Sequence, residues 1–213
     1  MNIALIGGTG FVGSRILPEL LQRGHAVSAL ARHPDKYAAH PRLRVVKADV
    51  LDAAQVSSGV AGHDAIISAF NPGWQEARIH DLFLQGCEAI IAGARMAGVT
   101  RLLVVGGVGS LFTEDGRQLV DDPTFPAEYR DGAIASREVL NRLRHENELE
   151  WTFLSPPAWL EPGQRSGTYR VGGEQVLLNG DDFAGISLED LAVAIVDEIE
   201  RPRHIRSRFT VAR

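Results

Sequence analysis

The chain of 213 residues contains one cysteine, no long apolar run and no excess of basic residues. A single cysteine excludes an internal disulfide framework and is typical of a reducing compartment. Because no apolar run could cross a bilayer, and no basic segment leads into an apolar one at the N-terminus, we expect neither membrane nor export. The formal net charge of −5 argues against a nucleic-acid-binding surface. These absences together predict a cytoplasmic protein.

The remaining composition is that of an ordinary globular protein, with 45% hydrophobic and 23% charged residues. Its length is typical of one domain, or of one domain with a small lobe. Cys87 lies in a helical apolar pattern, so we expect a buried small side chain rather than a nucleophile. No group of histidine, cysteine and acidic residues has the spacing of metal ligands, and no metal site is predicted.

The strongest motif is MNIALIGGTGFVG at the N-terminus. Residues 2–6 read as a buried strand, the glycines as a tight turn, and residues 11–21 have the apolar spacing of a helix. The glycines fit the dinucleotide pattern Gly8-x-Gly10-x-x-Gly13 and also Gly7-x-x-Gly10-x-x-Gly13, the pattern of short-chain dehydrogenases. Strand, glycine turn and helix in this order predict that a pyrophosphate binds at the helix N-terminus. A glycine-rich turn without a ligand is the alternative.

Strands and helices then alternate along the chain. We predict strands at 26–31, 43–47, 65–68, 101–105, 151–154 and 208–211, and helices from 53, at 81–97, at 134–145 and at 188–200. Asp52 and Ser187 are expected to cap two helices, and Gly98 to end a third. This alternation predicts an α/β fold: a Rossmann-type doubly wound parallel sheet with helices on both faces, and ligands outside the carboxyl ends of the strands.

The chain changes character after residue 105. A glycine loop at 106–110 leads into an irregular segment at 113–129, and short strands are expected at 168–171 and 175–178. Residues 1–213 are therefore expected to form a single NAD(P)-binding Rossmann domain. Its cofactor half is about 1–110, and its substrate-side elements, mainly 111–187, include a small C-terminal lobe. The five arginines from Arg201 onward are expected to form a solvated basic face.

Arg32 follows the second strand, where a dinucleotide fold reads the ribose. An acid at this point binds the 2′-hydroxyl of NAD, whereas an arginine accommodates the 2′-phosphate of NADP. No acid follows until Asp35, beyond a proline, so the sequence predicts NADP(H) in preference to NAD(H). The alternative is a solvated surface arginine.

Seven segments carry a resemblance to a known family: IGGTGFVG at 6–13, ALAR at 29–32, KADV at 47–50, DAIISA at 64–69, LVVGGVGSL at 103–111, FLSP at 153–156 and ISLEDLA at 186–192. With these segments the chain resembles the NmrA-like, NAD(P)H-binding branch of the atypical short-chain dehydrogenase/reductase superfamily. It is similar in particular to small bacterial proteins named NADH-flavin reductases or NAD-dependent epimerase/dehydratase-like proteins.

The resemblance implies a set of cofactor contacts. Those around the pyrophosphate are Gly7, Thr9, Gly10, Phe11 and Val12. Those toward the adenosine are Arg32 at the 2′-phosphate, Asp49 at the adenine amino group, and Val50 beside it. Those toward the ribose and nicotinamide are Ser68, Ala69, Phe70 and Pro156.

The chain departs from its superfamily at the catalytic positions. The usual members have a serine after the fifth strand and a Tyr-x-x-x-Lys on the next helix, but here Tyr129 is followed four positions later by Ala133. No lysine lies in residues 115–150, so nothing would lower the phenol pKa from near 10. Ser110 and Tyr129 are the candidates that remain for polar contact or proton donation.

Three functions follow from the resemblance and its departures. The favoured one is an NADPH-dependent reductase of a flat redox acceptor, a flavin or quinone, that stacks on the nicotinamide and takes its proton from solvent. Candidate stacking residues near the expected mouth are Phe70, Trp74, Leu111, Phe112, Tyr129 and Trp159. The alternative is a non-catalytic NADP(H)-sensing regulatory protein, and the third is a sugar-nucleotide epimerase or dehydratase. The protein is expected to be a monomer or homodimer.

Overall fold

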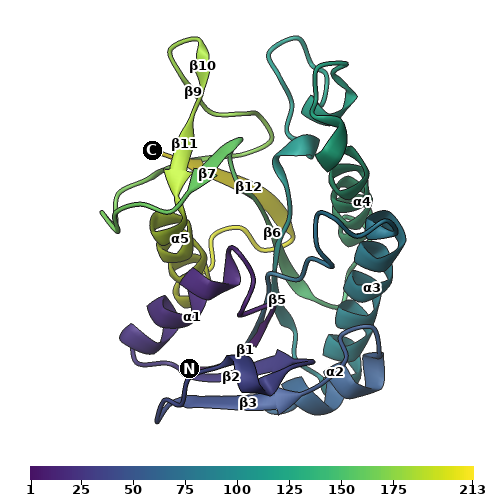
Figure 1. Cartoon of the computed structure of the whole chain (residues 1–213), viewed down its shortest axis with the longest axis vertical. Coiled ribbons are helices and arrows are strands. Elements are labelled where there is room, and N and C mark those ends of the chain that lie inside the picture. Colours follow the sequence, from purple (N-terminus) through teal and green to yellow (C-terminus); the bar gives the residue numbers. More distant parts are fainter.

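The computed structural model describes residues 1–213 and is built around an eight-stranded sheet (Figure 1). The strand order is β3-β2-β1-β4-β5-β6-β12-β8. All neighbouring strands are parallel except β8, which runs antiparallel to β12. The strands are β1 (Asn2–Ile6), β2 (Ala26–Ala31), β3 (Leu43–Lys47), β4 (Ala65–Ser68), β5 (Arg101–Val105), β6 (Glu150–Ser155), β12 (Ser207–Ala212) and β8 (Arg170–Gly172).

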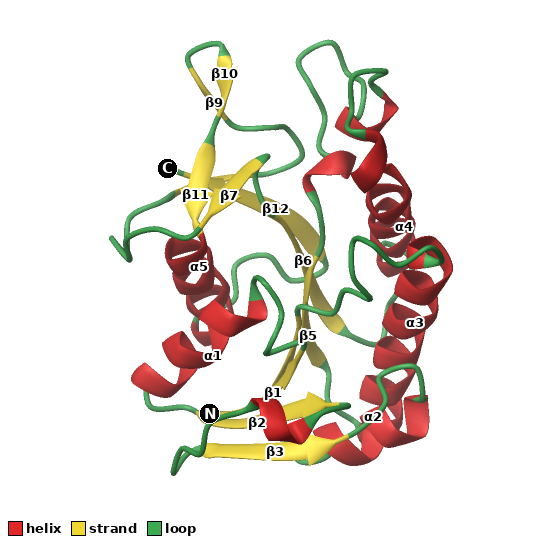
Figure 2. Ribbon diagram, in the orientation of Figure 1, coloured by secondary structure: helices red, strands yellow, loops and turns green.

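Helices cover both faces of this sheet (Figure 2). One face carries α1 (Gly13–Gln22) and α5 (Leu188–Glu200), and the other carries α2 (Ala53–Val60), α3 (Ile79–Ala97) and α4 (Ala127–Leu143). Side chains alternate along each strand, so Leu5 packs toward α1 and α5 while Ala4 and Ile6 pack toward the other layer. The predicted doubly wound fold is confirmed.

Several helices begin or end at the capping residues that the sequence predicted. Asp52 caps α2 by accepting the N–H groups of Ala54 and Gln55, and the Ser187 hydroxyl accepts the Asp190 N–H at 3.0 Å at the start of α5. Gly98 ends α3 in a left-handed conformation, with φ of 69°. Cys87 is buried in α3, where burial raises the pKa of its thiol to about 12.

Helix α4 begins about two turns before the residue at which the sequence predicted it. The early residues of this helix are mostly exposed and polar, so they carry no apolar periodicity that would reveal a helix. Tyr129 therefore lies on a helix rather than in an irregular segment. Two short 3-10 helices, η2 (Val108–Ser110) and η3 (Leu119–Asp121), lie before α4.

The C-terminal lobe consists of short paired strands. β7 (Trp159–Glu161) runs parallel to β11 (Gly185–Ser187), and β9 (Leu178–Asn179) is antiparallel to β10 (Asp182–Phe183). The sequence predicted short strands at 168–171 and 175–178 but none at β7, β10 or β11. Strands of two or three residues are too short to show an alternating pattern in the sequence, and they form because a partner strand pairs with them.

Four of the five C-terminal arginines are exposed, as expected: Arg201, Arg203, Arg206 and Arg213. The expectation fails only at Arg208, which is buried. Arg206 donates to the carbonyl oxygens of Leu149 and Asn147, and Arg208 is buried beside Glu174. Arg206 is exposed while its guanidinium donates to backbone carbonyls, whereas the Arg208 side chain is withdrawn from solvent. No helix is both long and apolar enough to cross a membrane.

Candidate dinucleotide-binding site

The glycine turn between β1 and α1 is packed so tightly that two of its positions exclude a side chain. Gly7 has φ of 81°, and a Cβ atom there would overlap the carbonyl group of Ala69. A Cβ atom on Gly13 would overlap the backbone of Gly7. The Gly10 N–H donates to the Gly7 carbonyl at 2.9 Å and closes the turn. These glycines shape a backbone loop against the end of β4.

The loop leaves a set of backbone donors without partners. The N–H groups of Thr9, Phe11, Val12 and Gly13 donate no hydrogen bond within the protein. They stand at the N-terminus of α1, which has no acidic residue in its first turn. Free N–H groups and the positive end of the helix dipole together attract an anion. The geometry fits the pyrophosphate of a dinucleotide.

The neighbouring loops lie along the same carboxyl edge of the sheet. Arg32 follows β2 and is exposed, without a hydrogen bond or ion pair to another residue. Asp49 follows β3, and its Oδ1 accepts the Leu51 N–H at 3.0 Å, which leaves Oδ2 without a partner. Ser68 ends β4 beside Ile6 of β1. The structure thus aligns Arg32, the glycine loop, Asp49 and Ser68 on one edge.

Several predicted contact residues are engaged in packing. Val50 is buried in the core, and Pro156 is buried after β6. Phe70 stacks on Phe83, with ring centroids 6.2 Å apart, and its ring fills the space beside Gly86. Phe70 therefore fastens the β4 loop to α3 and offers a ligand only the part of its ring that remains exposed.

The two candidate catalytic residues lie in different environments. Ser110 is buried, and the Arg208 Nη1 lies 3.4 Å from its hydroxyl oxygen. Tyr129 is 44% exposed, and its ring packs edge-on against Trp74 with centroids 5.2 Å apart. Neither residue is paired with a general base, and the position four residues after Tyr129 is Ala133. Tyr129 thus offers an exposed ring and Ser110 a buried hydroxyl, and neither lies beside a base that could take its proton.

The glycines after β5 explain why the usual strand-end serine is missing. A Cβ atom on Gly106 would overlap the ring of Phe153, and one on Gly107 would lie 3.6 Å from the Ser136 hydroxyl. The Phe153 ring thus fills the space that a side chain at Gly106 would need. Ser136 is buried, and its hydroxyl has no partner.

Two residues of this region escaped the sequence analysis. The Tyr37 hydroxyl lies against the glycine loop, at 2.8 Å from a Cβ atom placed on Gly8. Arg208 bridges Ser110, Ser155 and Glu174 beneath the loop after β5. Tyr37 stands outside any regular element and Arg208 in a run of arginines, so neither carried a local signal.

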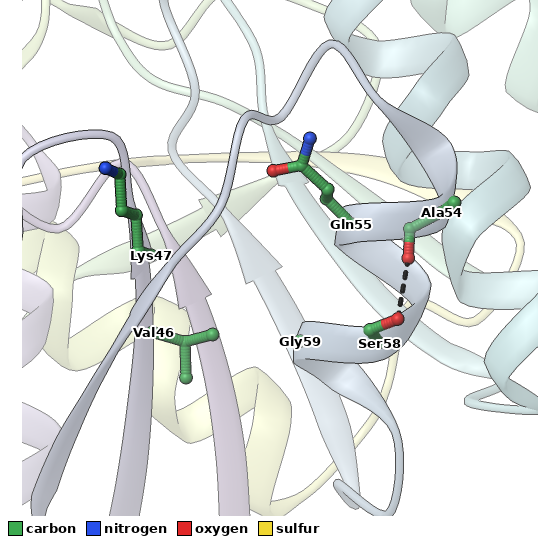
Figure 3. Close-up of a pocket in the computed structure, with 6 residues that line it drawn as sticks. All are labelled: Val46, Lys47, Ala54, Gln55, Ser58 and Gly59. Carbon is green, nitrogen blue, oxygen red and sulfur yellow. Dashed lines mark hydrogen bonds between the residues drawn. The ribbon is translucent and has the colours of Figure 1, made fainter.

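A hollow of about 280 Å³ lies between β3 and α2 (Figure 3). Lys47 is the only titratable residue among those that line it, which are Val46, Lys47, Ala54, Gln55, Ser58 and Gly59. The Gln55 side chain also accepts the Asp49 N–H at 2.9 Å, which links the hollow to the loop after β3. Its one hydroxyl, that of Ser58, donates to the Ala54 carbonyl at 2.9 Å, and no acid or histidine among the lining residues could activate it as a nucleophile.

Residues 7–202 match the model of a family described as NAD(P)H-binding. Three solved structures are similar over the whole chain. A proposed epimerase from Bacteroides thetaiotaomicron is 43% identical, with a TM-score of 0.92 over 99% of this chain and 96% of that one. A proposed exported protein from Burkholderia pseudomallei is 40% identical, with a TM-score of 0.90 over 100% of both. A proposed NADH-flavin reductase from Streptococcus pneumoniae is 33% identical, with a TM-score of 0.84 over 100% and 99%.

Proposed function

The chain belongs to the NAD(P)H-binding family, and we propose that it is an NADPH-dependent reductase of a flat redox acceptor such as a flavin or a quinone. One observation carries the proposal: the edge that bears the free glycine-loop N–H groups also bears exposed aromatic rings, without an acid–base pair. When bound, the nicotinamide supplies the hydride, and the protein orients the two partners. The proton for the reduced acceptor comes from solvent.

The preference for NADPH rests on Arg32. Its unpaired guanidinium follows β2, and the first acid beyond it is Asp35, past Pro34. A guanidinium pairs with a phosphate through two charge-assisted hydrogen bonds, which the 2′-hydroxyl of NADH cannot match. The proposed cofactor contacts are Gly7, Thr9, Gly10, Phe11, Val12, Arg32, Asp49, Val50, Ser68, Ala69, Phe70 and Pro156.

The acceptor is proposed to stack on the rings that follow β4 and begin α4. Trp74 is 49% exposed. Its ring packs against Tyr129 and against Gly132, which are both on α4. The Tyr129 hydroxyl makes no hydrogen bond within the protein, so it is free to contact an acceptor oxygen or nitrogen. Residues 1–110 would then hold the cofactor and residues 111–187 most of the acceptor site, within one domain.

A non-catalytic NADP(H) sensor is the second candidate. It is favoured by the fact that Ser110 is buried beside Arg208 and Tyr129 has no lysine partner. An epimerase or dehydratase function has less support. Such chemistry needs a general base held close to the reacting group, and no general base lies beside Ser110 or Tyr129. We also propose that the protein is cytoplasmic and that it is a monomer or a homodimer.

The decisive experiment follows NADPH consumption by the purified protein with a panel of flavins and quinones, while NADPH fluorescence reports binding. Acceptor-dependent consumption supports the reductase. Binding without consumption by any acceptor supports the sensor instead. Gly10→Val is the matched control, because consumption that persists in a variant unable to bind the cofactor comes from a contaminant.

A further inference from the structure

Tyr37 contacts the glycine loop from the neighbouring strand connection. A Cβ atom placed on Gly8 would lie 2.8 Å from the Tyr37 hydroxyl oxygen and 3.3 Å from Cε1 of its ring. The absence of a side chain at Gly8 thus makes room for Tyr37 as well as for a ligand. The hydroxyl interacts with the Thr9 side chain and the Gly8 backbone. Both belong to the glycine loop that is proposed to hold the pyrophosphate, called the cradle below.

The turn that ends at Tyr37 begins at Arg32. Its first end is held by the sheet, where Ala31 pairs with Lys47 and the Ala31 carbonyl accepts the Ala48 N–H at 3.1 Å. A single 3-10 turn, η1 (Pro34–Lys36), follows, and the Tyr37 N–H donates to the Pro34 carbonyl at 3.2 Å. Arg32 therefore lies between two anchors, β2 on one side and the Tyr37 ring on the other.

We propose that Tyr37 is a positioning residue for the 2′-phosphate of NADPH: its hydroxyl fastens the 32–37 turn to the glycine loop and so holds Arg32 at the ribose side of the cradle. The inference rests on the proposed NADPH preference and assigns part of it to a residue outside the glycine motif. Without this anchor the turn keeps its attachment to β2 and the contacts of η1 with β3, but nothing ties it to the glycine loop. Arg32 must then be ordered there by the cofactor itself, at an entropic cost.

The environment of the hydroxyl is consistent with this role. Burial raises the pKa of Tyr37, although the Thr9 side chain and the Gly8 backbone act in the opposite direction. The phenol therefore stays protonated at and above neutral pH, and it adds no negative charge next to a phosphate. A neutral hydroxyl fastens the turn without repelling the ligand.

The test is a double-mutant cycle of Tyr37→Phe and Arg32→Ala, with NADPH and NADH affinities measured by fluorescence titration. We expect Tyr37→Phe to weaken NADPH binding about three- to tenfold, the effect of one lost hydrogen bond, and to change NADH binding less than twofold. Because Tyr37 acts through Arg32, the double variant should bind NADPH no more weakly than Arg32→Ala alone.

Equal losses for both cofactors in Tyr37→Phe, or losses that add in the double variant, would overturn the inference. A wild-type protein that binds both cofactors equally would instead overturn the proposed preference itself. Tyr169→Phe is the matched control, because the Tyr169 hydroxyl is 2.6 Å from Asp197 on α5 and not in the glycine loop. Its preference should equal that of the wild type.

Discussion

Glu189 at the start of α5 holds Arg15 of the proposed phosphate-binding helix, with Arg15 Nε 2.7 Å from the carboxylate. The second carboxylate oxygen accepts the Gly163 N–H at 2.8 Å. Burial acts to raise the pKa of Glu189, but the Gly163 N–H and Arg15 outweigh it and hold the pKa below its ordinary value. One side chain thus joins α1, α5 and the segment that follows β7 in the C-terminal lobe.

Removing the charge of Glu189 is expected to destabilise the fold and to free the segment at Gly163. Glu189→Gln should cost about 1 kcal/mol in unfolding free energy, because the amide oxygen can accept one N–H but gives Arg15 no counter-charge. Trypsin should also cleave sooner at Arg165, whose segment begins at Gly163. The control is Glu148→Gln, a more exposed acid whose nearest cation is 3.4 Å away, and it should leave both readouts unchanged.

The glycine loop predicts opposite results for two of its positions. Gly10→Val should abolish dinucleotide binding with little change in melting temperature, since the nearest atom to a Cβ there is the Gly7 carbonyl oxygen at 3.2 Å. Gly13→Val should destabilise the fold by more than about 3 kcal/mol, because its side chain meets backbone. Thermal melts and fluorescence titrations separate the two, and undiminished binding by Gly10→Val would refute the motif assignment.

Reversing the charge at Arg32 tests how the ribose is read. Arg32→Glu should weaken NADPH binding at least about tenfold through loss of the phosphate pair and new repulsion, whereas NADH binding should hold or improve. Fluorescence titrations with both cofactors give the ratio. Equal losses for NADPH and NADH would show that Arg32 does not contact the 2′-phosphate.

The contact between Trp74 and Tyr129 predicts a variant that is impaired in acceptor binding alone. Trp74→Ala should raise the KM for a flavin or quinone several-fold, since the stacking surface is lost, and leave the NADPH affinity unchanged. The control is Met96→Ala, which removes a hydrophobic side chain that is 63% exposed at the C-terminal end of α3. It should change neither the acceptor KM nor the NADPH affinity. Unchanged acceptor kinetics in Trp74→Ala would move the acceptor site elsewhere.

His80 predicts a pH dependence of stability. Its contacts with Asp81 and with Glu138 on α4, each 3.1 Å long, raise the pKa of the imidazole above its ordinary value of 6.5. A group whose pKa is raised by folding stabilises the protein fully below the ordinary value, and loses that contribution as pH rises through the raised one. For this exposed cluster the contribution is at most about 0.5 kcal/mol.

Chemical denaturation of the wild type and His80→Gln between pH 5 and 9 measures this term. The stability difference between the two proteins should be largest at the acidic end and should shrink as pH rises. A difference that grows with pH would contradict the raised pKa.

Local patterns were sufficient to predict the central sheet and the glycine loop. Strands β1, β2, β3, β4 and β5 have the predicted bounds. Strands β1, β2, β4 and β5 are mostly buried and read as short, largely apolar runs between turn residues, whereas the edge strand β3 has no buried residue. The caps at Asp52 and Ser187 were also predicted, since each is made by neighbours within three residues. Signals of this kind lie within one element, so a single sequence contains them.

Only the tertiary structure decided which distant residues meet. The hydroxyl of Tyr37 reaches Gly8, Trp74 packs on Tyr129, and Arg208 is buried beside Ser110 rather than in solvent. Each contact joins segments brought together by strand order and helix packing, and the residues involved have no local pattern that announces a partner. The sequence by itself determined the cofactor class and pointed to the sheet edge proposed for it. The packing of loops on that edge decided which side chains are buried in the fold and which remain exposed there.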